Sequence, residues 1–134
     1  RSGALRSAAR MYAAQAKVRS PKLHVTVRKA YGFGSSLMAM NPFDRQTITL
    51  AFPGATLGAM PAGGGGTAAH ADSQTQSALD AAEAGGPWAV ADTMNYDEII
   101  DPRELRNVLL RALDPAMARY KEAPVEPRAG GIRP

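Results

Sequence analysis

The sequence predicts a single α/β domain of layered strands and helices, and three observations support that class. Two runs rich in β-branched residues, 23–30 and 46–52, have the length of buried strands. A helical segment from Ser35 to Met40 separates them, so that strand, turn, helix and strand follow one another. Helices are predicted at both ends of the chain, and 134 residues suffice for one modest domain.

The first predicted elements are a helix and a strand. Residues 4–18 are rich in alanine and contain no glycine or proline, which favours a helix that ends before Pro21. His24 lies within the strand predicted over 23–30. We expect it to be a partly exposed strand residue rather than a ligand, because the only other histidine, His70, lies in a different, polar context.

The middle of the chain continues the pattern and then changes character. Pro53 and Gly54 close the second strand, and residues 55–60 form a third short extended piece. Four consecutive glycines follow at 63–66, without the Gly-Lys-Ser/Thr that a nucleoside-triphosphate loop requires. We therefore interpret residues 61–69 as a flexible connection.

Two further helical segments complete the pattern. Residues 70–84 predict a helix that Gly85-Gly86-Pro87 interrupts, before a short apolar turn at Trp88 to Val90. Residues 97–100 have the length of an edge strand. A helix over 101–113 has the clearest local signal: Asp101 as N-cap, Pro102 at the first helical position and Glu104 three residues after the cap, completing a capping box.

Composition excludes several classes of protein. The absence of cysteine excludes disulfides and thiolate metal sites, and no metal centre is predicted. No apolar run approaches the ~18 residues of a membrane span, so we expect a cytoplasmic protein without membrane contact. The net charge is +4, but aromatic residues do not interleave with the basic ones, which argues against nucleic acid. An acidic partner or a phosphorylated cofactor suits this charge better.

Two glycines flank Phe33 where the first strand gives way to a helix. Gly32 and Gly34 either only permit a tight turn or let the turn present backbone N–H groups to a ligand oxygen. Local sequence alone leaves both interpretations open.

In combination, several segments resemble the biotin-dependent carboxyltransferase family, the β-subunits of acyl-CoA carboxylases such as propionyl-CoA carboxylase. Pro21 to Gly32 is similar to the family's Pro-Lys-(apolar)-x-Val-x-x-Arg-Lys-Ala-Tyr-Gly. Residues 51–55 resemble its Ala-Trp-Pro-Thr-Ala, and Leu57 to Met60 its apolar segment ending in Met-Gly. Asp97 to Leu113 is similar to its Val-Asp-Asp-(Val/Ile)-Ile-Asp-Pro-x-Glu-x-Arg helix.

The resemblance implies a crotonase-like ββα superhelix (the ClpP/crotonase fold). Residues 1–123 would correspond to the C-terminal half of the family's C-terminal domain, and 124–134 would form an extended Pro/Gly-rich tail. It further implies transfer of a carboxyl group from carboxybiotin, on a carrier protein, to the α-carbon of an acyl-CoA. The implied partners are a biotin carboxylase or biotin carrier subunit and other carboxyltransferase subunits.

The resemblance also assigns roles to the turn. The main-chain amides of Phe33 and Gly34 would be the oxyanion donors that bind the ureido oxygen of biotin, with Tyr31 and Gly32 completing the biotin-binding segment. Many members have Gly-Gly-Ala where this chain has Gly-Phe-Gly. Ser36 occupies the position linked to the choice of acyl chain. The family's acyl-CoA site lies in an N-terminal domain with no counterpart here, so the isolated chain is expected to be inactive.

Two other functions stay open at this point. The chain could belong to a crotonase-like enzyme of another reaction, for example a hydrolase that uses the same amide pair on a thioester carbonyl. It could also be a non-catalytic module that pairs with a catalytic subunit.

Overall fold

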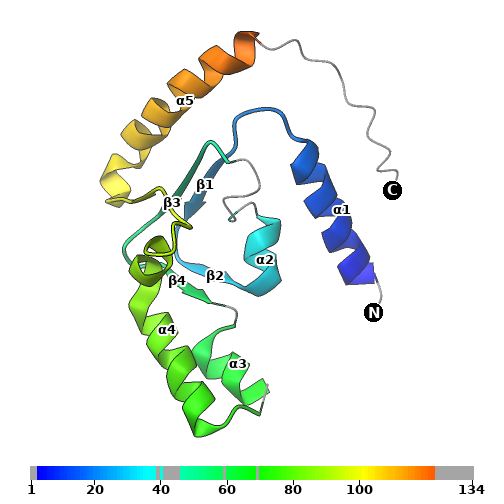
Figure 1. Ribbon diagram of the computed structural model, residues 1–134, viewed down its shortest axis with the longest axis vertical. Helices are drawn as coiled ribbons and strands as arrows, with labels where there is room; N and C mark the ends of the chain where they lie inside the picture. The colour runs from blue at the N-terminus through cyan, green and yellow to red at the C-terminus, as the bar shows by residue number, and fades with distance from the viewer. Residues whose placement is uncertain (1–2, 39, 41–45, 59, 69, 123–134) are drawn as a thin grey trace.

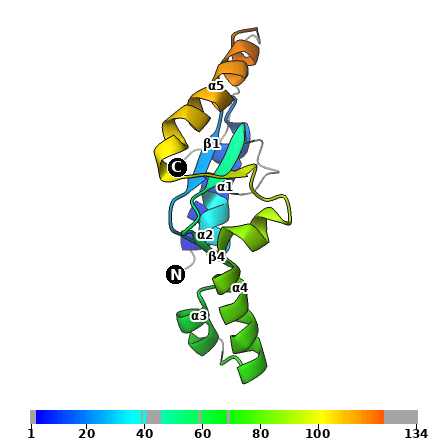
Figure 2. The ribbon, with the colours of Figure 1, turned by 90° about the vertical axis from the view of Figure 1, so that its left-hand side faces the viewer.

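A computed structural model describes residues 3–38, 40, 46–58, 60–68 and 70–122. The elements follow the order α1 (Gly3–Lys17), β1 (Leu23–Thr26), β2 (Lys29–Tyr31), α2 (Gly32–Leu37), β3 (Ile48–Ala51), β4 (Thr56–Gly58), α3 (Ala62–Ala68), α4 (Ser73–Ala91), β5 (Glu98–Ile99) and α5 (Leu105–Glu122). The strands lie in the middle of the molecule, with α5 toward one end and the α3–α4 pair at the other (Figures 1 and 2). The predicted α/β class is confirmed, whereas the predicted tail 124–134 lies outside the described residues.

The strands form two small parallel sheets. One has the order β1-β3-β5, in which Leu23 faces Ile48 and Leu50 faces Glu98. The other pairs β2 with β4, so that Lys29 faces Thr56. The predicted edge strand before the C-terminal helix is thus confirmed as β5.

The prediction of one continuous strand over 23–30 is wrong, because the chain bends and continues in the second sheet. The connection from β3 to β4 bends with it. The Phe52 N–H donates to the Thr26 carbonyl at 3.0 Å, and the Thr56 N–H donates to the Arg28 carbonyl at 2.6 Å. These two bonds lie on either side of the bend. The β1–β2 and β3–β4 segments therefore pass together from the three-stranded sheet to the two-stranded sheet. Val27, at the bend, is exposed.

Strand β3 separates the two parts of the core. Leu50 and Ala51 are both fully buried, and they point to opposite faces because side chains alternate along a strand. Leu50 packs with Ile100 and Val108, the latter from α5. Ala51 packs with Ala55, Leu57 and Tyr96. A strand that is apolar on both faces is typical of a central strand in a parallel sheet.

The glycine-rich segment is a helix, which corrects the prediction of a flexible connection over 61–69. Helix α3 includes all four glycines, and side chains of α4 bind the backbone of its first residue, Ala62. The Ala62 N–H donates to the Glu83 carboxylate at 2.8 Å, and the Gln76 side-chain amide donates to the Ala62 carbonyl at 2.9 Å. Both partners belong to α4, so tertiary contacts outweigh the weak helix propensity of glycine.

The later helices follow the sequence signals closely. Gly86, at φ 55° and ψ −146°, interrupts α4 immediately before Pro87, as predicted. The Asp101 carboxylate accepts the Arg103 N–H at 2.9 Å and caps a short 3-10 turn, Pro102–Glu104, that leads into α5. The Glu104 carboxylate accepts from the Asn107 side chain rather than completing the predicted box. Helix α5 also continues beyond the predicted end, through Pro115 to Glu122.

Candidate functional site

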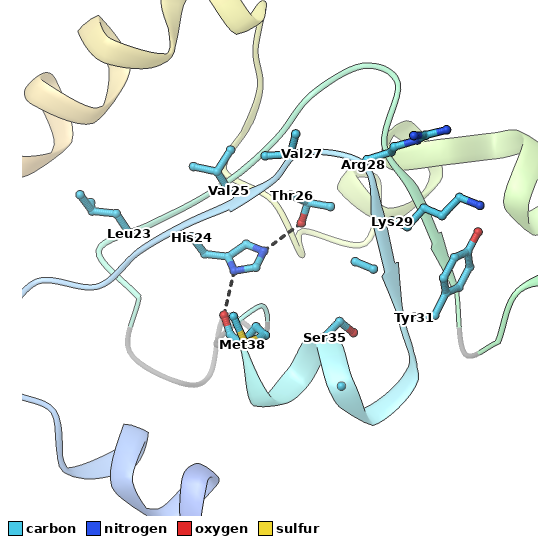
Figure 3. Close-up of a pocket in the computed structure, with 12 residues that line it drawn as sticks. Leu23, His24, Val25, Thr26, Val27, Arg28, Lys29, Tyr31, Ser35 and Met38 are labelled. Carbon is cyan, nitrogen blue, oxygen red and sulfur yellow. Dashed lines mark hydrogen bonds between the residues drawn. The ribbon is translucent and has the colours of Figure 1, made fainter. Parts of the chain in front are cut away.

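A cavity of about 680 Å³ opens between the β1–β2 segment and α2 (Figure 3). Its wall consists of every residue from Leu23 to Tyr31 together with Gly34, Ser35 and Met38. This volume is within the usual range of small-molecule sites, which is roughly 300–1,000 Å³. The wall combines apolar side chains with a few polar groups, as such sites generally do.

The turn that enters α2 has the backbone geometry expected of an open helix start. Tyr31 is extended, with φ −125° and ψ 140°, and makes no side-chain cap hydrogen bond. Gly32 follows at φ 58°, in the left-handed region that glycine adopts without strain. The Ser35 hydroxyl donates to the Gly32 carbonyl at 2.7 Å and so braces the turn. Helix α2 therefore begins at Gly32, three residues before the predicted start.

This geometry places the amides of Phe33 and Gly34 in the first turn of the helix. Amides in a first turn have no carbonyl partner within their own helix. They are also aligned with the positive end of the helix dipole, which favours an electron-rich oxygen. Gly34 has no side chain that could cover these groups, and an added Cβ would meet no atom within 4 Å.

The structure brings some of the predicted site residues to the cavity and not others. Tyr31 and Gly34 line it, whereas Ser35 rather than Ser36 lies in its wall. The Phe33 side chain is 56% exposed and stacks on Tyr12 of α1, with ring centroids 6.3 Å apart. Burial raises the pKa of the Tyr31 hydroxyl, which lies near Thr56 and Glu83.

His24 is a partly exposed strand residue, as expected, but sequence reasoning missed its hydrogen bonds. Its side chain lies in the cavity wall, where Nδ1 is 3.0 Å from the Met38 carbonyl oxygen and Nε2 is 2.9 Å from the Thr26 hydroxyl (Figure 3). The Thr26 hydroxyl is 2.8 Å from the Tyr96 hydroxyl. Burial lowers the pKa of His24, partly offset by the bond to Met38. The available signal was the spacing, because residues i and i+2 of a strand share a face.

The charged side chains in the wall of the cavity are basic. Arg28 and Lys29 are exposed residues of its wall, and the sequence has no acidic residue before Asp44. Such a wall suits a ligand that carries or develops negative charge. Within the described part of the chain, no group of three or more His, Cys, Asp or Glu residues could hold a metal ion. Nor is any described helix long and apolar enough to cross a membrane.

Solved structures share this fold. A 12S transcarboxylase structure with hydrolysed methylmalonyl-CoA bound matches with a TM-score of 0.73 and 26% identity, over 96% of this chain and 26% of that chain. A single-chain, multi-domain long-chain acyl-CoA carboxylase matches with a TM-score of 0.66 and 28% identity, over 83% of this chain and 12% of that one. The β-subunit of geranyl-CoA carboxylase from P. aeruginosa matches with a TM-score of 0.69 and 22% identity, over 94% and 26% of the two chains.

The match covers nearly all of this chain but only a small part of each relative. The chain spans about a quarter of the length of the 12S transcarboxylase subunit. No protein-family model matches the sequence, and no curated protein matches it significantly. The chain therefore has the fold of part of the crotonase-fold carboxyltransferase domain of 12S transcarboxylase and acyl-CoA carboxylase β-subunits.

Proposed function

We propose that this chain provides the biotin-binding part of an acyl-CoA carboxyltransferase. The observation that carries the proposal is the position of Gly34, which lies both in the open first turn of α2 and in the wall of the cavity. The likeness to carboxyltransferases of known structure supports the same reading. Carboxybiotin, delivered on a carrier protein, supplies the carboxyl group that the enzyme transfers to the α-carbon of the acyl-CoA.

Residues of this chain bind and polarise the ureido group of biotin. The amides of Phe33 and Gly34 would donate to its oxygen and would stabilise negative charge there. Fixed donors aimed at a developing oxyanion lower the barrier because they need no reorganisation during the reaction. Gly32 permits the turn, and Tyr31 contributes one wall of the cavity.

The cavity fits such a ligand. Apolar wall residues, including Leu23, Val25 and Ala30, suit the hydrocarbon and sulfur parts of biotin, while the turn meets its polar ring. In this proposal no side chain of the segment acts as a general base. Ser36, beside the cavity-lining Ser35, is the residue proposed to influence the choice of acyl chain.

The partners follow from the same proposal. The 12S transcarboxylase is described as a hexamer and was solved with methylmalonyl-CoA bound. By analogy, we propose that this chain acts within an oligomer of carboxyltransferase subunits. The acyl-CoA would be held mainly by other parts of the assembly, and a biotin carrier subunit would enter at the cavity.

Biotin dependence is the test that separates this function from its alternatives. The protein, in its complete assembly, is given methylmalonyl-CoA with and without free biotin, and loss of the carboxyl group is followed. We expect decarboxylation that requires biotin and saturates with it.

The other outcomes identify the alternatives. Thioester hydrolysis without biotin would indicate a crotonase-like hydrolase that uses the same amides. Absence of both activities, in an assembly that still binds its partner subunits, would indicate a non-catalytic interaction module.

A further inference from the structure

The hydrogen bonds of the neutral His24 ring admit a single arrangement of protons. The Met38 carbonyl can only accept, so the Nδ1 atom at 3.0 Å from it carries the proton. In the neutral ring Nε2 is then an acceptor, and the Thr26 hydroxyl donates to it. The Thr26 oxygen in turn accepts from the Tyr96 hydroxyl. A series of hydrogen bonds therefore runs from Tyr96 through Thr26 and His24 to Met38.

This chain of bonds connects α2 to the three-stranded sheet. Helix α2 has only six residues, and its first residue follows directly from β2. Met38 is the C-cap of α2, so its carbonyl marks the opposite end of the helix. His24 and Thr26 belong to β1, and both Thr26 and Tyr96 are buried. The imidazole thus joins the far end of a short helix to a strand of the core.

We propose that His24 is a positioning residue: its neutral imidazole ties the C-terminal end of α2 to β1 and so keeps the first turn of α2 at the cavity. This tie, the hydrogen bond between His24 and the Met38 carbonyl, does not depend on a ligand. Its effect on turnover rests on the proposed function. A short helix that is held at one end only can tilt, and displacement of a binding group by about 1 Å can cost on the order of 10²-fold in rate.

Protonation of the ring would break this arrangement. Nε2 would become a donor, Thr26 would have to donate to Tyr96, and the proton of the Tyr96 hydroxyl would lose its acceptor. The other ionisable groups of the cavity wall are Arg28, Lys29 and Tyr31, whose residue types do not ordinarily titrate between pH 5 and 7. Helix α2 and strand β3 carry no ionisable side chain. His24 is therefore the group that changes charge there in this range.

Histidine titration tests the tie without any assay of activity. The protein is labelled with 13C at the histidine Cε1, and the His24 and His70 signals are assigned by their loss in His24→Asn and His70→Asn. We expect His24 to titrate below its ordinary value of 6.5, as the Nδ1–H tautomer. Tyr96→Phe should not raise this pKa, because the reversed Thr26 hydroxyl then has no acceptor for its own buried proton. A raised His24 pKa in Tyr96→Phe would overturn the proposed series of hydrogen bonds.

Substitution of His24 tests the consequence for α2. Asparagine places an amide N–H near the position of Nδ1–H, whereas alanine removes the donor. Loss of one hydrogen bond typically corresponds to a change of about tenfold, so hydrogen exchange of the α2 amides should accelerate by that factor in His24→Ala. Exchange should stay near the unsubstituted rate in His24→Asn, and in the matched control His70→Asn. Equal exchange in all three variants would refute the tie.

The pH dependence of turnover distinguishes a positioning residue from a residue that only stabilises the fold. Biotin-dependent activity should decline as the pH falls through the His24 pKa, chiefly through a raised KM for biotin. His24→Asn should retain activity and lose this acid limb. An acid limb that survives in His24→Asn would refute the positioning role. If no biotin-dependent turnover occurs at all, the proposed function fails, and the titration and exchange experiments still decide the tie.

Discussion

Two glycine-rich segments of this chain use the same residue for opposite purposes. At Gly32 and Gly34, glycine permits an open turn: Gly32 adopts φ 58°, and an added Cβ at Gly34 would have no atom within 4 Å. At Gly65 and Gly66, glycine permits close packing. An added Cβ would lie 2.6 Å from the Met60 Cβ at Gly65 and 1.7 Å from the Gln76 Oε1 at Gly66. The first segment borders the cavity, and the second packs α3 against its surroundings. A glycine run therefore indicates a ligand site only when its backbone stays uncovered.

Replacement of Gly34 by proline should have the largest effect on function. Proline is tolerated in the first turn of a helix but has no N–H, so one proposed oxyanion donor is lost. Loss of such a donor typically lowers the rate on the order of 10²–10³-fold. We expect this decrease in biotin-dependent decarboxylation, measured on the complete assembly.

The matched control for this variant is Gly34→Ala. Alanine keeps the N–H and meets no neighbouring atom, so the amide donor persists. Proline also restricts Phe33 before it, and circular dichroism must confirm that the fold is retained. A folded Gly34→Pro protein with the activity of Gly34→Ala would make these glycines turn-formers only.

Gly65→Ala should have the largest effect on stability. Overpacking typically costs about 1–3 kcal/mol, and the better helix propensity of alanine returns about 1 kcal/mol. We expect a net decrease of up to about 2 kcal/mol in the free energy of unfolding, measured by urea denaturation. A rise in stability of about 1 kcal/mol would instead show that Met60 moves aside without cost and that the packing at α3 is loose.

Gly32→Ala should destabilise the protein by about 1 kcal/mol, because the left-handed conformation costs a residue with a Cβ roughly that amount. The same urea experiment measures it. Gly32→Asn serves as the comparison, since asparagine tolerates this conformation better than alanine. Equal losses of stability in the two variants would indicate that the added side chain, rather than the positive φ, causes the destabilisation.

The smallest expected effect has the opposite sign. Gly64 has no atom within 4 Å of an added Cβ, although it lies in the same helix as Gly65. Gly64→Ala should therefore stabilise the protein, by about 0.5–1 kcal/mol, through helix propensity alone. A loss of stability would mean that Gly64, like Gly65, is closely packed against its neighbours.

His24 adds a dependence of stability on pH. Its pKa is lowered in the folded chain, so the unfolded chain binds a proton first, near pH 6.5. Stability is therefore complete above this value and decreases as the pH falls toward the folded-state pKa. Urea denaturation at several pH values should show this decrease in the unsubstituted protein and not in His24→Asn.

The sequence predicted the elements that local signals specify. The Asp101 cap, the interruption at Gly86-Pro87 and the strand over 46–52 all appear in the structure. These features depend on neighbouring residues and on backbone preferences that are visible in the chain itself. The α/β class and the likeness to carboxyltransferases are confirmed as well.

The missed features depend on contacts that are distant in sequence. The helix at 62–68 is held by Gln76 and Glu83, and the change of sheet after Thr26 follows the bend of a strand more than 20 residues away. The spacing of His24 and Thr26 along one strand indicates their contact, but the bond from Thr26 to Tyr96 joins residues 70 positions apart and has no local signal. The oxyanion roles of Phe33 and Gly34 and the selectivity role of Ser36 stay predictions.

The order of strands in the larger sheet also affects how this chain folds while it is being synthesised. Strand β3 is central, but its partner β5 follows it by about 50 residues along the chain. While the ribosome adds α3 and α4, the second edge of β3 therefore has no partner, and unpaired edges promote association with other chains. We expect nascent chains that end before Glu98 to bind chaperones more strongly than chains that include β5 and α5, which selective capture of ribosome-bound chains would measure.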